Sequence, residues 1–310
     1  MPHSDDPSPI EIFDRRALRA RRHRAARAAG SGGGGHAFLF DEIADRLLDR
    51  LDDVSRPFPR ALDLGARHGA VARALGGRGQ VQTLVTADVA TAAAEPSQRP
   101  AVVAEPDLLP FAPGSFDLVL SNLAMHWVND LPGALLQLRH VLRPDGLLLA
   151  AMLGGETLTE LRQALLAAEI AEENGASPRV SPFADLRDAA GLLQRAGFAM
   201  PVADADTLTV TYPDALALMR DLRGMGEANA LAERRRGFTR RATLARAAAE
   251  YQERFAEPDG RIRATFQVIY LTGWAPHPEQ PKPLRPGSAA ARLADALGAA
   301  EQPAGDKAGG

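Results

Sequence analysis

Short apolar runs alternate with helical patterns along most of this 310-residue chain. Residues 60–64, 116–121 and 147–152 are largely apolar, and segments with helix-like spacing of apolar residues separate them. A strand that is apolar on both faces must be covered on both faces, which is typical of a parallel sheet between two layers of helices. The alternation therefore predicts an α/β fold, in which ligands bind beyond the carboxyl ends of the strands.

The same reasoning predicts the remaining elements. Apolar residues at helical spacing indicate helices, and prolines and glycines mark where these end. The expected helices cover residues 38–51, 71–75, 131–142, 157–173, 184–196 and 239–255, with one more after Pro213, and further strands are expected at residues 81–87, 101–104, 207–212 and 264–274. We therefore expect one sheet with helices on both faces.

Composition divides the chain into three segments. Residues 1–35 form a basic segment that we expect to be disordered apart from one helix, since residues 15–27 carry seven arginines and the glycines of residues 30–35 predict a hinge. We interpret the arginine-rich stretch as a solvated helix. Residues 36–275 are expected to form the folded domain, with helical additions on the acceptor side. Repeated prolines predict a disordered tail over residues 276–310.

One face of the basic helix carries Arg15, Arg19 and Arg22, which would suit docking to an acidic partner. A transit peptide and a nucleic-acid arm are the alternatives. Acidic residues precede the helix, whereas transit peptides are poor in acids. The net charge of −3 and the pI of about 6.2 argue against a nucleic-acid partner.

Composition also excludes several kinds of chemistry. The chain has no cysteine, so it can form no disulfide, cysteine nucleophile or thiolate metal site. Its seven histidines show no ligand-like spacing, and we therefore predict no metal site. No apolar run approaches the roughly 18 residues that a membrane span needs. We expect a cytoplasmic protein without a transmembrane segment.

Three carboxylates stand at or just after the ends of three expected strands. Asp63 lies in the first strand, and Gly65 and Gly69 follow it, where a backbone without side chains can approach a ligand closely. Asp88 ends the second strand, where an acid typically binds the two hydroxyls of a ribose. Glu105 follows the third strand and could receive an adenine amino group. This order predicts a nucleoside-containing cofactor.

A nicotinamide dinucleotide is the alternative cofactor, because dehydrogenases use similar geometry. Their G-x-G-x-x-G fingerprint is absent, since Arg67 stands where its second glycine would be. A pyrophosphate would have little room there. A compact cofactor without phosphates fits better.

Several later segments resemble a known family. Residues 109–111 and 114–119, Leu-Pro-Phe and Gly-Ser-Phe-Asp-Leu-Val, resemble a segment of class I S-adenosylmethionine-dependent methyltransferases. Residues 121–132 resemble the branch that contains the biotin-pathway malonyl-carrier-protein O-methyltransferase and the mitochondrial complex I assembly factor with a methyltransferase fold. Residues 151–158 and 224–229 resemble the assembly factor more closely.

The resemblance runs from about residue 12 to residue 274, and it implies the sheet order 3-2-1-4-5-7-6 with the final strand antiparallel. It also implies S-adenosyl-L-methionine as the cofactor. In the family, the loop after the first strand carries a further glycine where Arg67 stands. The expected cofactor-binding residues are Asp63, Gly65, Ala66, Gly69, Asp88, Val89, Glu105, Pro106 and Asn122.

His126 is the candidate catalytic residue. It follows the fourth expected strand, beside the place where the resemblance puts the reactive methyl group. As a general base it would accelerate transfer to an amine or hydroxyl by roughly a hundredfold or more, whereas a carboxylate acceptor needs no base. The alternative is a structural histidine that caps this loop while Trp127 packs against the core.

Two functions remain open. The first is methyl transfer from S-adenosyl-L-methionine to a protein or carrier-bound acceptor, with the helices in residues 157–196 and 213–255 covering the acceptor. The second is assembly of respiratory complex I through hydroxylation of an arginine in a quinone-proximal subunit, which the resemblance to the assembly factor implies.

Overall fold

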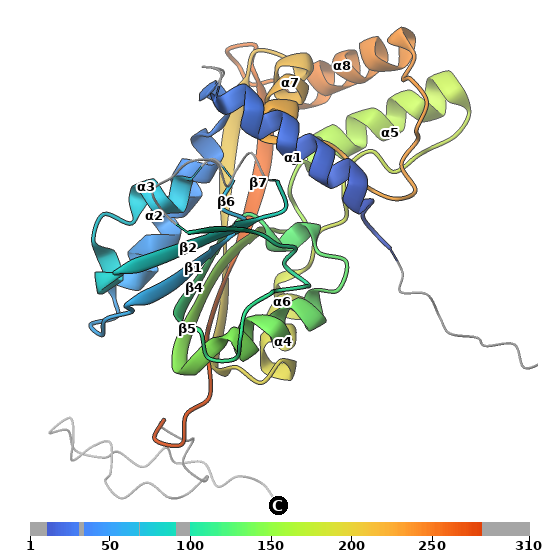
Figure 1. The fold of residues 1–310 in the computed structure, drawn as a ribbon. Coiled ribbons are helices and arrows are strands. Elements are labelled where there is room, and N and C mark those ends of the chain that lie inside the picture. Colours follow the sequence, from blue (N-terminus) through green and yellow to red (C-terminus); the bar gives the residue numbers. More distant parts are fainter. Residues whose placement is uncertain (1–10, 31–33, 68, 91–99, 281–310) are drawn as a thin grey trace, which may run out of the picture. The chain divides into compact units, whose positions relative to one another are not determined.

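The computed structural model describes residues 11–30, 34–67, 69–90 and 100–280 (Figure 1). Most of the tail predicted to be disordered, the first ten residues of the basic segment and His68 in the glycine loop lie outside the described residues. Of the predicted hinge at residues 30–35, residues 31–33 also lie outside the described residues.

The described part of the chain contains a seven-stranded sheet in the order β3-β2-β1-β4-β5-β7-β6, which confirms the predicted order. Neighbours from β3 to β5 pair in parallel, whereas β7 is antiparallel to both β5 and β6, as expected. The strands are β1 (Arg60–Leu64), β2 (Thr83–Asp88), β3 (Ala101–Val103), β4 (Phe116–Asn122), β5 (Leu142–Leu153), β6 (Ala199–Tyr212) and β7 (Ile262–Trp274).

Helices cover both faces of this sheet, as predicted. One face carries α2 (Phe38–Asp52), α3 (Ala70–Ala74), α5 (Thr159–Glu173), α7 (Ala215–Met225) and α8 (Arg241–Phe255), and the other carries α4 (Leu131–Val141) and α6 (Leu186–Arg195).

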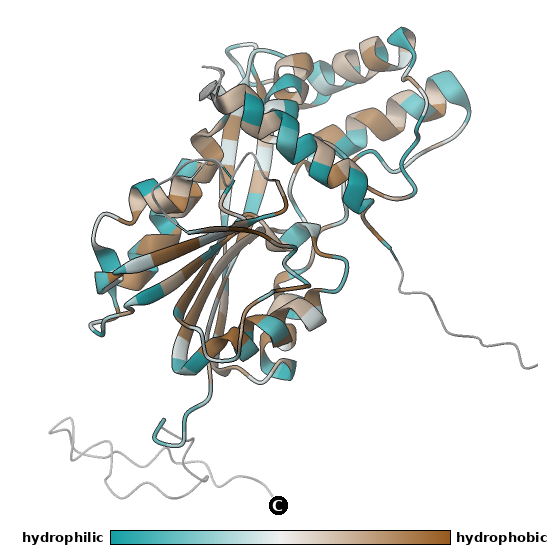
Figure 2. Cartoon of the chain, viewed as in Figure 1, coloured by the Kyte–Doolittle hydropathy of each residue, from teal (hydrophilic) through white to brown (hydrophobic). Residues whose placement is uncertain are grey.

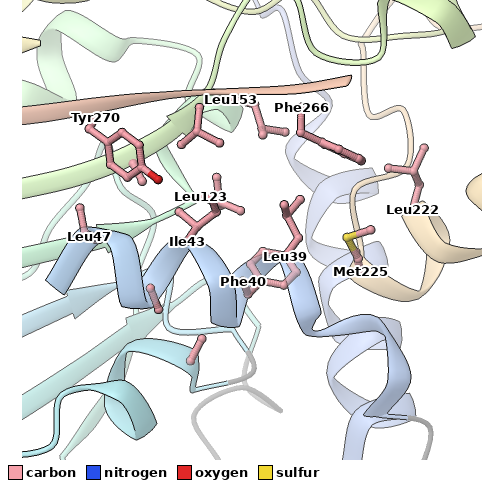
Figure 3. Packing of buried hydrophobic residues seen from close by; sticks show 14 of the residues in the cluster. Leu39, Phe40, Ile43, Leu47, Leu123, Leu153, Leu222, Met225, Phe266 and Tyr270 are labelled. Atoms are coloured by element: carbon pink, nitrogen blue, oxygen red, sulfur yellow. The ribbon is translucent and has the colours of Figure 1, made fainter. Parts of the chain in front are cut away.

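Alternation along the strands divides the core into two. Leu118 and Leu120 of β4 belong to the α2 side, whereas Val119 between them belongs to the α4 side. Figure 2 shows the central strands as the most apolar part of the domain. Figure 3 shows α2 side chains such as Ile43 and Leu47 turned toward the sheet. Both faces of the central strands are therefore buried, as the sequence pattern predicts.

The arginine-rich stretch forms α1 (Arg15–Gly30), which packs against α7 (Figure 1). Leu18, Arg22 and Ala25 are buried, with exposed fractions of 7, 5 and 5%. The interpretation as a solvated helix is therefore wrong for this face. Residues four and three positions apart lie on one side of a helix, and here that side faces the strand ends.

Candidate functional site

The loop after β1 passes close to the segment that follows β4. Gly65 has a φ of 77°, and its backbone N–H donates to the carbonyl of Ala87 over 2.7 Å. A Cβ atom at this position would lie 2.3 Å from the Cβ atom of Ala124. Glycine is therefore required both by the left-handed backbone and by the close approach. Gly69, also left-handed, precedes α3, and Ala66 donates to Ala87 over 3.3 Å.

Asp88, at the end of β2, is buried beside this loop. Its Oδ2 atom accepts from the backbone N–H of Arg67 over 3.1 Å, and Oδ1 accepts from that of Ala90 over 2.8 Å. A carboxylate has about four acceptor positions, so further bonds are available to it. Asp63 is fully buried. Asn122, at the end of β4, donates from Nδ2 to the carbonyl of Phe40 over 2.8 Å.

Glu105 lies beyond β3 and is bound by α1. Its Oε2 accepts from Arg15 over 2.7 Å and its Oε1 from Arg19 over 2.6 Å, while Arg15 also donates to Asp107 over 2.6 Å. The acidic partner that suits the basic face of α1 is thus, in the described residues, a pair of acids in the same chain. Sequence reasoning singled out both groups and did not connect them.

Little space remains between α1 and these strand ends. A cavity of about 20 Å³ borders Val89, Glu105 and Pro106, and one of about 10 Å³ borders Asp88 and Arg67. Arg22 borders both. Cavities of this size hold about one water molecule each. We call this region, bounded by α1 and residues 63–67, 88–89 and 105–106, the strand-end cleft.

The polar groups of the strand-end cleft match those that an adenosyl compound needs. With α1 in its observed position, however, the free volume of the cleft is too small for such a compound. Asp88 and Glu105 offer carboxylate acceptors, and Val89 offers an apolar surface. The Nε and Nη2 atoms of buried Arg22 have no hydrogen-bond partner among the described residues. Burial lowers the pKa of Arg22 to about 10, with Arg67 adding to this effect. A buried guanidinium with open donors favours an anionic or carbonyl-bearing ligand.

Arg67 occupies the side of the cleft that faces β4. Its Nη1 pairs with Glu227, its Nη2 donates to the carbonyl of Leu123 over 2.8 Å, and its guanidinium lies 4.8 Å from the centre of the Phe40 ring. The sequence identified Arg67 only as a missing glycine. The structure shows that its side chain fills space in which a glycine would leave room.

Glu227 joins Arg67 to the candidate catalytic histidine. Its Oε2 accepts from Nε2 of His126 over 3.0 Å and from Nε1 of Trp127 over 2.8 Å. Burial by itself would raise the pKa of Glu227, but the charges of Arg67 and Arg22 and the hydrogen bond from His126 outweigh burial and hold the pKa well below its ordinary range. Glu227 lies in the segment 224–229 that resembles the assembly factor, but the sequence pattern by itself indicates no role for it.

Both ring nitrogens of His126 are engaged. The backbone N–H of Leu153 donates to Nδ1 over 3.3 Å, so the proton is on Nε2 and points to Glu227. The side chain is fully buried, and burial lowers its pKa more than Glu227 raises it. His126 is therefore neutral near pH 7. In this arrangement His126 orients Glu227. To act as a base, His126 would first have to break its hydrogen bond to Glu227.

A cavity of about 600 Å³ opens on the other side of Glu227. We call it the open chamber. Its inner wall is formed by residues of α2, β5, α5, α7 and β7 and of the loop after β4, among them Leu39, Leu123, Leu153, Leu161, Leu222 and Phe266. Figure 3 shows several of these side chains around one space. Because Leu123 and Glu227 line the open chamber and also contact Arg67, the open chamber adjoins the strand-end cleft.

The described residues contain no group of three or more His, Asp or Glu side chains placed to hold a metal ion. No helix among them combines the length and apolar character that crossing a membrane requires.

Comparison with known proteins gives a consistent result. A family model described as a methyltransferase domain matches residues 34–201. The chain is 43% identical to "Arginine-hydroxylase NDUFAF5, mitochondrial" of Danio rerio, over 92% of this chain and 89% of the relative, and 41% identical to the Homo sapiens protein of that name, over 92% and 83%. It is 38% identical to "Malonyl-[acyl-carrier protein] O-methyltransferase" of Halorhodospira halophila, over 87% of this chain and 90% of the relative.

Solved structures agree on the fold. The YcgJ protein of Bacillus subtilis superposes with a TM-score of 0.52 at 16% identity, covering 75% of this chain and 99% of that protein. A putative methyltransferase of Bacillus halodurans gives the same values. At this level of identity the likeness concerns the fold alone.

The comparisons also correct one expectation. We expected a cytoplasmic protein, but the relatives at 41–43% identity are named as mitochondrial proteins. That expectation was wrong, because it rested only on the lack of cysteine and of a membrane span, and neither feature distinguishes one reducing compartment from another. The fold, the strand order and the domain match agree in a single conclusion: this chain belongs to the class I methyltransferase family and is an enzyme of that fold.

Proposed function

We propose that this protein transfers a methyl group from S-adenosyl-L-methionine to a protein or carrier-bound acceptor that enters through the open chamber. One observation carries the proposal. Trp127 borders both the open chamber and the larger cavity of the strand-end cleft, and Arg67 of the cleft contacts Leu123 and Glu227 of the chamber, so a cofactor in one would lie next to an acceptor in the other. Pockets of 300–1,000 Å³ are typical of small-molecule sites, and the open chamber lies in this range.

The cofactor would supply an electrophilic methyl group on a sulfonium centre. For the chain's own residues, we assign Asp88 to the ribose hydroxyls, Glu105 to the adenine amino group and Val89 to the adenine face. Asp63, Gly65, Ala66, Gly69, Pro106 and Asn122 complete the proposed binding set. The open donors of Arg22 suit the carboxylate of the methionine part. Because Arg22 and Arg67 occupy the strand-end cleft, binding requires their side chains to move.

The protein would act on the acceptor mainly by positioning it, and less by removing a proton from it. An acceptor carboxylate needs no base, and alignment of the reacting groups alone can lower the barrier by several kcal/mol. His126 is held neutral and turned to Glu227, so we propose that it reaches an amine or hydroxyl acceptor only when this contact opens.

A direct test supplies purified full-length protein with S-adenosyl-L-methionine and a malonyl-carrier protein. Intact-mass analysis should show the acceptor gaining one methyl group. Asp88→Asn should weaken cofactor binding about tenfold or more, as expected for a lost charge-assisted hydrogen bond, whereas exposed Asp49→Asn should not. Unchanged cofactor affinity in Asp88→Asn would contradict the assignment of the strand-end cleft.

The second candidate function is hydroxylation of an arginine in a complex I subunit, and one observation favours it. Glu227, the carbonyl of Leu123 and the ring of Phe40 together hold the guanidinium of Arg67. The same three groups could hold the guanidinium of a substrate arginine once Arg67 has moved. The reaction would insert one oxygen atom and would consume dioxygen and a two-electron reductant. An arginine peptide that gains one oxygen atom when these are supplied would support this function.

A further inference from the structure

The residues that line the open chamber differ in their exposure to solvent. Most of its leucine side chains and Phe266 are buried, whereas Arg223, Arg235 and Arg236 are exposed. The interior is thus apolar and the mouth is cationic. A ligand that matches both parts has an aliphatic chain and one anionic group, because burying the charge inside would cost free energy without a partner.

Not all of the chamber's arginines are available to such a ligand. Six of them line it: Arg21, Arg179, Arg223, Arg234, Arg235 and Arg236. Three of these are paired within the chain, as Arg179 contacts Glu169, Arg234 contacts Asp14 over 2.8 Å, and Arg235 contacts Glu173. The carboxylate of Glu227, which also lines the chamber, is matched by Arg67.

Three cations remain for which the described residues provide no ion pair, namely Arg21, Arg223 and Arg236. Arg21 is the most constrained of them. It donates from Nη1 to the carbonyl of Ala228 over 3.2 Å, and burial together with the charges of Arg234 and Arg24 lowers its pKa in spite of the opposite effect of Asp14. A half-buried cation among like charges is stabilised by an anion at the same place. Arg21 comes from α1 and Arg223 from α7, two helices that contact each other.

We infer that the open chamber binds a medium-chain aliphatic carboxylate, with its chain on the leucine wall and its carboxylate at Arg21 and Arg223. The inference goes beyond the proposed function and does not require this ligand to be the methyl acceptor. Binding itself needs neither the cofactor nor methyl transfer, so the two ideas can fail separately.

Isothermal titration of the full-length protein with decanoate, without cofactor, tests the inference. Shortening the ligand to hexanoate should weaken binding by roughly fourfold for each methylene removed, as expected for burial of the chain. Decanol, which keeps the chain and lacks the charge, should bind about tenfold more weakly than decanoate.

Arg223→Gln and Arg21→Gln should each weaken decanoate binding about tenfold and leave decanol binding unchanged. Arg220→Gln is the matched control, because Arg220 is exposed on α7 and does not line the open chamber. Equal affinity for decanoate and decanol, or equal effects of Arg223→Gln and Arg220→Gln, would overturn the inference. An affinity independent of chain length would overturn it as well, since it would indicate binding at surface charges.

Discussion

Arg67 of the strand-end cleft pairs with Glu227 of the open chamber, but the interiors of these two neighbouring regions differ: side chains fill the first, and the second is open. In the strand-end cleft, the side chains of Arg22 and Arg67 leave cavities of only about 10 and 20 Å³. In the open chamber, about 600 Å³ stays unfilled between apolar walls. A buried guanidinium can be paired with carboxylates of the same chain, whereas an apolar cavity of this size gains stability only from a ligand. In the cleft, the charge of Arg67 is thus matched by Glu227 while Arg22 keeps donors that are open among the described residues, whereas the open chamber offers a largely apolar space to a ligand.

Glu227→Gln should have the largest effect, because it leaves Arg67 buried without its counterion. We expect the free energy of unfolding to fall by about 3–5 kcal/mol, measured by urea denaturation. The double variant Arg67→Met, Glu227→Gln should recover most of this loss, since it removes both charges. A loss below about 1 kcal/mol in the single variant would show that the pair does not hold the cleft together.

Arg67→Gly should make the cleft resemble the chamber by emptying it. We expect the affinity for S-adenosyl-L-methionine to rise about tenfold, or about 1.4 kcal/mol, since the side chain no longer has to be displaced. Calorimetric titration measures the change. Arg67→Lys keeps a cation and most of the volume and serves as the control. If glycine and lysine give the same affinity, Arg67 does not obstruct the site.

His126 should make stability depend on pH. Its pKa in the folded protein is lowered from the ordinary value of 6.5, so between the folded value and 6.5 the unfolded chain binds more protons. The free energy of unfolding should therefore decrease as the pH falls below about 6.5, by at most about 1.4 kcal/mol per pH unit. Denaturation between pH 7 and 5 checks this slope, which His126→Gln should flatten. An unchanged slope would assign it to other groups.

Arg15→Gln with Arg19→Gln should have the smallest effect on stability. The two side chains are 43 and 52% exposed, and exposed ion pairs contribute about 0.2–1 kcal/mol each. Hydrogen exchange in α1 should nevertheless become faster, because these pairs join it to the strand ends. Arg16→Gln is the control on the same helix. Equal exchange in both variants would show that packing alone holds α1.

The sequence was sufficient for most of the fold. Burial on both faces left a clear pattern in β1, β4 and β5, and the family resemblance supplied the strand order. The sequence pattern missed the first half of β6, which begins at Ala199 and not at Thr207. This edge strand exposes many of its side chains and carries Pro201 near a register shift, so it lacks an apolar signal.

The candidate site was predictable only in part. Asp88 and Glu105 could be placed because strand ends are local features of the sequence. The cluster of Arg22, Arg67 and Glu227 could not, because its members lie far apart in the chain and each looks like an ordinary surface charge. Only the packing of α1 and α7 over the strand ends brings them together.

The attachment of α1 to Glu105 has a thermodynamic consequence. Each oxygen of this carboxylate already accepts from an arginine of α1, so a bound adenine that uses Glu105 must compete with Arg15 or Arg19. Helix docking and cofactor occupancy are then negatively linked, and each lowers the other by the same factor. Since added salt weakens exposed ion pairs, a rise in ionic strength shifts this balance toward the cofactor.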